Sequence, residues 1–267
     1  MERIQRALEL ARRDREQGRN NAAVAVATVV ASPRPSTATR AARLPLSPDV
    51  LERNRVLGSG GDAAVRAAYR MLRTQVLQRM REHALQTLAI VSPGSGEGKS
   101  LTAANLAISI AEDAGHHALL VDFDLRRPNL AGLFGLTPTV GLDDYLRGEA
   151  RLEEVICRPE PFERLAVLPV RAPVERSSEL LTGAIARAFV AEVRGRYADR
   201  VVVFDLPPVL ASDDALAFSP LVDAALVVAA EGRTRRDDLR RCIDLLRATR
   251  IVGTVLNNSA DVGARAY

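Results

Sequence analysis

The chain has 267 residues, of which 47% are hydrophobic and 26% charged, so it is long enough to bury a full core. It contains no run of about 18 apolar residues, the length that a membrane-spanning helix needs, and we expect a cytoplasmic protein. Cys157 and Cys242 lack the spacing of a metal site, so we expect two structural cysteines in a reducing compartment.

Charge is unevenly distributed along the chain. Residues 1–82 contain 16 arginines against 8 acidic residues, whereas the remainder is slightly acidic. The basic part could meet anionic lipid, nucleic acid or an acidic partner, or it could be an ordinary solvated surface. Of the 37 basic residues only Lys99 is a lysine, which singles out one compact ammonium group for phosphate chemistry.

The first 61 residues are predicted to form two parts. Residues 1–19 place Met1, Ile4, Leu8 and Ala11 at helical spacing, which predicts a short amphipathic helix able to dock on a partner or a membrane surface. Residues 20–61 are rich in Ala, Pro, Ser, Thr and Gly, a composition typical of a linker.

Residues 62–258 alternate between amphipathic helical patterns and short apolar runs, and residues 259–267 form a short tail. A helix is predicted from Asp62 to Met80, and further helical patterns cover residues 101–111, 178–193 and 239–246. The runs expected to form strands are 87–91, 118–121, 165–168, 201–204, 224–228 and 251–256. Alternation of this kind predicts an α/β fold with a doubly wound, mainly parallel sheet.

The first of these strands leads into a glycine-rich loop and then a helix. The loop reads Ser92-Pro93-Gly94-Ser95-Gly96-Glu97-Gly98-Lys99-Ser100, which is a phosphate-binding P-loop except that Pro93 replaces the usual first glycine. Glycines let the backbone N–H groups curl around phosphate oxygens, and the start of the helix adds partial positive charge. Lys99 is expected to reach the β- and γ-phosphates, and Ser100 to bind Mg²⁺.

Three carboxylates follow apolar strands behind this loop. Asp122 and Asp124 are two positions apart and can face the same crevice, and Asp205 ends a later strand. Because Mg²⁺ keeps several waters and takes few protein ligands, Ser100 with one or two carboxylates is sufficient. The sequence therefore predicts a P-loop NTPase that binds ATP with Mg²⁺.

These motifs resemble those of the bacterial tyrosine kinases of exopolysaccharide and capsule synthesis, a branch of the MinD/ParA-like P-loop ATPases. The resemblance rests on three motifs: P-loop residues 96–100, the Asp122-x-Asp124-x-Arg126-x-Pro128 run and Asp205-x-Pro207-Pro208. It covers about residues 62–258. Gly94 stands where MinD and ParA proteins carry their signature lysine, which favours the kinase branch.

The resemblance implies a set of site residues. Asp124, Asp205 and Ser100 would hold the metal, and Asp122 would accept the tyrosine proton. Asn257 would contact adenine, and Tyr267 is the possible phosphoacceptor, although the tyrosine cluster usual in the family's tail is absent. The implied nucleotide-binding residues are Gly94, Ser95, Gly96, Glu97, Gly98, Lys99, Ser100, Leu101 and Asn257.

Three functions are open at this point. The leading one is a tyrosine autokinase that regulates exopolysaccharide chain length beside a membrane-spanning copolymerase, with possible homo-oligomers. Because Ala67 replaces the glutamate that precedes Arg70 and Arg73 in the family's oligomer-forming helix, ring assembly is in question. The alternatives are a nucleotide-switched binding module for such a membrane protein and, third, a ParA-like positioning ATPase, with nucleic acid an unlikely partner.

Overall fold

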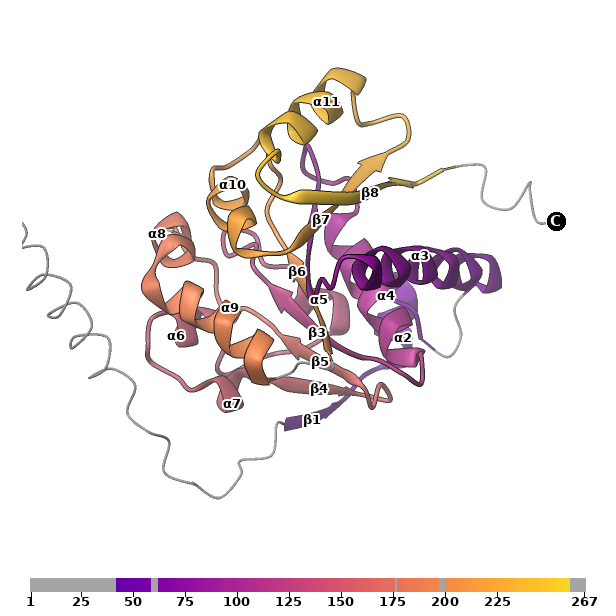
Figure 1. Cartoon of the computed structure of the whole chain (residues 1–267). Helices are drawn as coiled ribbons and strands as arrows, with labels where there is room; N and C mark the ends of the chain where they lie inside the picture. The colour runs from indigo at the N-terminus through magenta and orange to yellow at the C-terminus, as the bar shows by residue number, and fades with distance from the viewer. Residues whose placement is uncertain (1–41, 59–61, 176, 197–199, 260–267) are drawn as a thin grey trace, which may run out of the picture. The chain divides into compact units, whose positions relative to one another are not determined.

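The computed structural model describes residues 42–58, 62–175, 177–196 and 200–259. The predicted N-terminal helix (1–19) and Tyr267 lie outside these ranges. The central feature is an eight-stranded sheet of order β1-β4-β5-β3-β6-β2-β7-β8 (Figure 1). Its strands are β1 (Ala42–Pro45), β2 (Thr87–Val91), β3 (His117–Asp122), β4 (Cys157–Glu160), β5 (Leu165–Leu168), β6 (Arg200–Asp205), β7 (Ala224–Ala230) and β8 (Arg250–Asn257).

Six of the strands run parallel to one another, as the sequence predicts, and these are the six expected strands. The exception is one end of the sheet, where β4 pairs antiparallel to β5 and β1 pairs parallel to β4. The α/β fold with a doubly wound, mainly parallel sheet is therefore confirmed.

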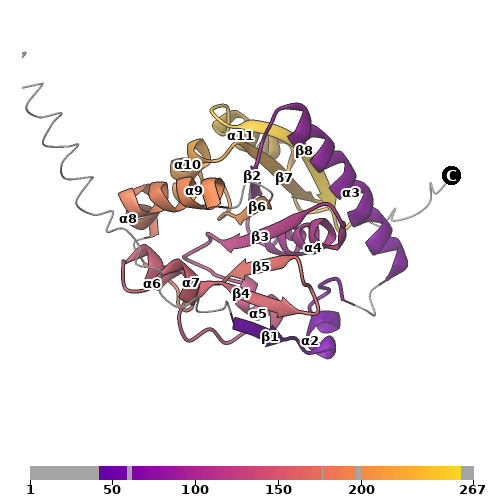
Figure 2. The same ribbon diagram turned by 60° about the horizontal axis from the view of Figure 1, so that its bottom comes forward.

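Helices cover both faces of the sheet (Figures 1 and 2). Leu88 and Ile90 of β2 pack in one core with α2, α3, α4 and α5, while Ala89 and Val91 pack in the other with α6 to α11. The helices are α2 (Pro48–Arg53), α3 (Ala63–Glu82), α4 (Lys99–Glu112), α5 (Leu130–Phe134), α6 (Leu142–Leu146), α7 (Leu152–Val155), α8 (Ser177–Thr182), α9 (Ala184–Arg196), α10 (Asp214–Phe218) and α11 (Arg236–Leu245), with a 3-10 turn at Ser219–Leu221. No helix among the described residues is long and apolar enough to cross a bilayer.

The linker predicted over 20–61 is wrong for residues 42–58, which contain β1 and α2 and belong to the folded core. Leu51, Val56 and Leu57 are buried at 3–4% exposure. The backbone N–H of Leu57 donates to Oδ1 of Asn105 at 2.8 Å. Pro45 ends β1, and Ser47 and Pro48 begin α2, so the residues that suggested a linker mark the boundaries of two short elements.

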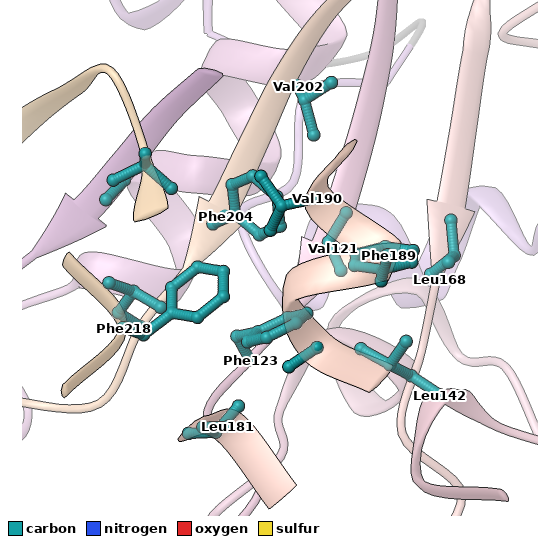
Figure 3. Close-up of a cluster of buried hydrophobic side chains, with 14 of the residues drawn as sticks. Val121, Phe123, Leu142, Leu168, Leu181, Phe189, Val190, Val202, Phe204 and Phe218 are labelled. Carbon is teal, nitrogen blue, oxygen red and sulfur yellow. The ribbon is translucent and has the colours of Figure 1, made fainter. Parts of the chain in front are cut away.

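Four phenylalanines form the centre of the core on the α6–α11 side (Figure 3). The ring centroid of Phe123 lies 4.4 Å from that of Phe218, 5.3 Å from Phe204 and 5.8 Å from Phe189. Such offset and edge-on contacts add to the stabilisation from burial. Since Phe123 stands between Asp122 and Asp124 and Phe204 precedes Asp205, this packing anchors the strand ends that carry the predicted metal ligands.

At the opposite, amino end of the sheet, Asp223 joins β2, β7 and α9. Its carboxylate accepts hydrogen bonds from the N–H groups of Gln86 (3.0 Å) and Thr87 (2.9 Å) and pairs with Arg194 at 2.7 Å. Burial alone would raise the pKa of Asp223, but these hydrogen bonds and the arginine charge outweigh it and hold the pKa below its ordinary value.

Candidate nucleotide site

The predicted P-loop lies between β2 and α4 and is closed by its own side chains. Oε2 of Glu97 accepts a hydrogen bond from the Gly94 N–H at 2.8 Å, and the Ser92 hydroxyl donates to the Gly94 carbonyl at 2.8 Å. Gly98 has φ +86°, a left-handed conformation that glycine adopts without a Cβ penalty. Helix α4 begins directly afterwards at Lys99, so its unpaired N-terminal N–H groups open onto the loop.

The Lys99 ammonium reaches across to both later motifs. Its Nζ donates to Oδ1 of Asp205 at 2.9 Å, to Oδ2 of Asp124 at 3.2 Å and to the Ser100 hydroxyl at 3.3 Å. Burial alone would lower the pKa of Lys99, but the charges of Asp205 and Asp124 raise it above its ordinary value. The three sequence motifs therefore meet at one point, as the sequence predicts.

Asp122 is held by backbone groups at the end of β3. Its Oδ2 accepts from the N–H groups of Asn129 (3.1 Å) and Leu130 (3.0 Å), and its Oδ1 from that of Asp124 (3.3 Å). The side chain is fully buried, and burial together with the nearby charge of Asp205 raises its pKa to about 8.

Asp205 ends β6 directly opposite Asp122 of β3. Its Oδ2 is buried and accepts no hydrogen bond from the described residues, although a buried carboxylate oxygen normally has a partner. Among the same residues, no three carboxylate, histidine or cysteine side chains gather as a complete metal site. A free oxygen of Asp205, with Asp124 and the Ser100 hydroxyl, fits a hard cation that keeps waters and phosphate oxygens as its other ligands.

A second set of contacts closes the other side of the loop. The Thr234 hydroxyl, just before α11, donates to Oε1 of Glu97 at 2.5 Å, and Nδ2 of Asn257 donates to the Glu97 carbonyl at 3.0 Å. The guanidinium of Arg233 lies against Gly96. Asn257 thus lies beside the loop, as expected. Arg233 and Thr234 were not predicted from the sequence, although they follow the carboxyl end of β7, the edge of the sheet where the other site residues lie.

The other predicted features lie away from this point. Arg73 of α3 donates to the Ser109 carbonyl of α4 at 3.0 Å, inside the chain, and Arg70 is exposed. Two open pockets of about 380 and 270 Å³ share residues 161–163 between β4 and β5 and contain none of the motif residues.

Comparison with known protein families decides the class of this chain. Residues 88–262 match the CobQ/CobB/MinD/ParA nucleotide-binding domain. The chain is also 30% identical to the tyrosine-protein kinase YwqD of Bacillus subtilis, over 71% of this chain and 79% of that protein. The chain belongs to the bacterial tyrosine-protein kinase family. It further resembles the succinoglycan biosynthesis transport protein ExoP of Rhizobium meliloti, with 34% identity over 65% of this chain and 22% of ExoP.

Solved structures agree with this assignment. The kinase domain of the Escherichia coli tyrosine kinase ETK superposes with a TM-score of 0.68 and 26% identity, covering 85% of this chain and 91% of that domain. The septum site-determining protein MinD of Pyrococcus horikoshii, solved with Mg-ADP, superposes with a TM-score of 0.55 and 27% identity, covering 64% and 69%. Family members thus share the P-loop nucleotide-binding fold found here.

Proposed function

We propose that this chain is an ATP-dependent protein-tyrosine kinase of exopolysaccharide or capsule synthesis. The observation that carries the proposal is the convergence of Lys99, Asp124 and Asp205 within hydrogen-bond distance in a member of the tyrosine-kinase family. The relation to a succinoglycan biosynthesis protein supports the assignment to polysaccharide synthesis.

Each site residue has a proposed task. The backbone N–H groups of residues 94–101 cradle the phosphates, and Lys99 moves its charge from the carboxylates to the β- and γ-phosphates. Ser100, Asp124 and Asp205 would hold Mg²⁺, whose chemistry there would be neutralisation of phosphate charge. Asn257, fixed beside the loop through the Glu97 carbonyl, borders the base.

Asp122 is the proposed acceptor of the tyrosine proton. Burial raises the pKa of Asp122, which makes this carboxylate a stronger proton acceptor than an ordinary aspartate. The N–H groups of Asp124, Asn129 and Leu130 orient this carboxylate at the sheet edge.

The proposed phosphoacceptor is Tyr267 on a neighbouring copy. Of the four tyrosines, Tyr69 and Tyr145 are described, and both are partly buried against the domain. Burial raises the pKa of Tyr69, and the Tyr145 ring packs edge-on against Phe189. Both side chains are therefore engaged within the domain, while Tyr197 and Tyr267 lie outside the described residues. We assign the acceptor role to Tyr267 because the family resemblance places phosphorylated tyrosines in the C-terminal tail.

Mass spectrometry for phosphotyrosine after incubation with Mg-ATP tests the proposal. We expect phosphate on Tyr267 in the wild type and none in Lys99→Ala or Tyr267→Phe. The Tyr267→Phe variant keeps the whole nucleotide site, so its ATP binding controls for folding. Nucleotide binding by the wild type without any phosphotyrosine would contradict the kinase proposal.

The proposed partner is a membrane-spanning polysaccharide copolymerase, which would bring the chain to the inner membrane. ExoP supports this because a domain like the present chain forms 22% of that transport protein. The kinase assay repeated with the cytoplasmic tail of a candidate copolymerase is expected to show faster phosphorylation. An unchanged rate, with no binding of the tail in either nucleotide state, would remove this partner.

A further inference from the structure

Arg126, two positions beyond Asp124, binds a buried carboxylate that the proposed chemistry does not use. Its Nε donates to Oδ2 of Asp214 and to the Ser177 hydroxyl, both at 2.9 Å, and its Nη2 approaches Oδ1 of Asp214 at 3.3 Å. The Ser177 hydroxyl in turn donates to Oδ2 of Asp214 at 2.6 Å. Three segments, the loop after β3 and the starts of α8 and α10, therefore meet at one carboxylate.

The acceptor of this cluster is shielded from water. Asp214 and Ser177 are both at 0% exposure, and the Arg126 side chain is 42% exposed. A buried carboxylate that loses its cation is strongly unfavourable, so the pair is a firm link between the segments it joins. The hydrogen bonds of Ser177 and Arg126 to the same oxygen fix the direction of approach as well as the distance.

The link joins the two strand ends that carry the proposed metal ligands. On one side, the Arg127 N–H donates to Oδ1 of Asp124 at 3.2 Å, so the loop that holds Arg126 also orients Asp124. On the other side, Asp214 follows Asp205 by nine positions. The segment between them is tied to the P-loop, because the Val209 N–H donates to the Ser92 carbonyl at 2.9 Å.

We propose that the Arg126–Asp214 pair, braced by Ser177, is a positioning device that sets the separation of Asp124 and Asp205 and thereby the affinity of the site for Mg²⁺. The proposal rests on the proposed function, since it assumes that these two carboxylates hold the metal. Arg126 acts through Asp124 and does not itself need to touch nucleotide or metal.

The chain offers a matched control at the other end of the sheet. Arg194 and Asp223 also form a short arginine–carboxylate pair, at 2.7 Å with 37% and 22% side-chain exposure, and they likewise join three elements. This pair contacts neither the β3 loop nor the segment after β6 that leads to α10. A loss of the control pair therefore costs stability without moving the metal ligands.

The test measures binding of a fluorescent ADP analogue in EDTA and across a Mg²⁺ titration. For Asp214→Asn we expect affinity in EDTA within twofold of the wild type and a Mg²⁺ midpoint raised at least fivefold. Asp223→Asn should leave the midpoint unchanged while lowering the melting temperature. Ser177→Ala removes only the brace, so it gives a smaller shift, about two- to threefold, and serves if Asp214→Asn fails to fold.

The outcomes separate the two proposals. A wild type whose ADP binding ignores Mg²⁺ would refute the proposed function. A wild type that responds to Mg²⁺, with an unchanged midpoint in Asp214→Asn, or in Ser177→Ala if the former does not fold, would refute the positioning role alone. Equal shifts in Asp214→Asn and Asp223→Asn would also overturn it, because the effect would then reflect general destabilisation.

Discussion

Gly98 offers a sharp test of the loop geometry, because two independent features of the structure require glycine there. Its φ of +86° is unfavourable for any residue with a Cβ, and a Cβ added at this position would overlap Nδ2 of Asn257. Gly98→Ala must therefore either displace the Asn257 side chain or distort the loop. Both responses disturb the loop conformation that the proposed phosphate site requires.

The expected magnitude follows from these two features. A left-handed alanine costs about 1–2 kcal/mol, and loss of the hydrogen bond from Asn257 to the Glu97 carbonyl costs about 1 kcal/mol. We expect the nucleotide-free loop of Gly98→Ala to adopt a different conformation, which nucleotide binding must convert back. The full cost of about 2–3 kcal/mol then reduces the binding free energy, which corresponds to an affinity loss of roughly 30- to 150-fold.

Titration with a fluorescent ATP analogue measures this loss, and three further variants, Gly232→Ala, Asn257→Ala and the double variant, separate its parts. Gly232 also has positive φ (+70°), but a Cβ there meets nothing within 4 Å, so Gly232→Ala carries strain without overlap, outside the phosphate loop. Combining Gly98→Ala with Asn257→Ala removes the overlap and leaves the strain. We expect the double variant to lose about 1 kcal/mol less than the sum of the two single variants.

Two results would refute the reasoning. Gly98→Ala with wild-type affinity would mean that the left-handed turn is not needed for nucleotide binding. Strict additivity of Gly98→Ala and Asn257→Ala would mean that Asn257 does not press against the loop, and its proposed place beside the base would lose its structural support.

Three further predictions concern stability and can be checked by urea unfolding. Phe189→Ala should lower the free energy of unfolding by about 3–5 kcal/mol, whereas Ile185→Ala on the same helix, 41% exposed, should change it by less than about 1 kcal/mol. Leu51→Ala should cost about 2–5 kcal/mol, because the 42–58 segment is part of the core; a neutral effect would restore the linker interpretation. Since the folded pKa of Asp223 lies below its unfolded value, its stabilisation is complete above about pH 4 and is lost as pH falls further, so Asp223→Asn should flatten the acid limb of the stability profile; an unchanged limb would contradict this.

Most of the parallel strands could be predicted because strands that are buried on both faces consist almost entirely of apolar residues. β2, β3, β5, β6 and β7 are almost wholly buried on both faces, so each reads as an apolar run with clear ends. β1 and β4 escaped prediction for the opposite reason. β4 reads Cys157-Arg158-Pro159-Glu160 with alternate residues exposed, and its pairing with neighbouring strands, more than its own composition, makes it a strand.

In the candidate site, too, residues in local sequence motifs could be predicted, whereas contacts between residues far apart in the sequence could not. Lys99, Asp124 and Asp205 could be predicted because each stands in a local strand-to-loop pattern whose end must lie at one sheet edge. The contacts of Thr234 with Glu97 and of Arg126 with Asp214 join residues 137 and 88 positions apart, and nothing in either local segment specifies its partner. Those contacts required the packing of α10 and α11 to be known.

The contacts of Lys99 suggest why this position carries the chain's one lysine although the other 36 basic residues are arginine. Lys99 is 8% exposed, and its one nitrogen bonds Asp124 in the loop after β3 at 3.2 Å and Asp205 at the end of β6 at 2.9 Å. A planar guanidinium is wider and is suited to bidentate pairing with one carboxylate, as Arg171 does with Asp144 at the surface. A compact charge on a flexible stem suits a position between two acids from which, in the proposed mechanism, it moves to a phosphate. The proposed function therefore gives a physical reason why the one lysine of an arginine-rich chain stands at this position.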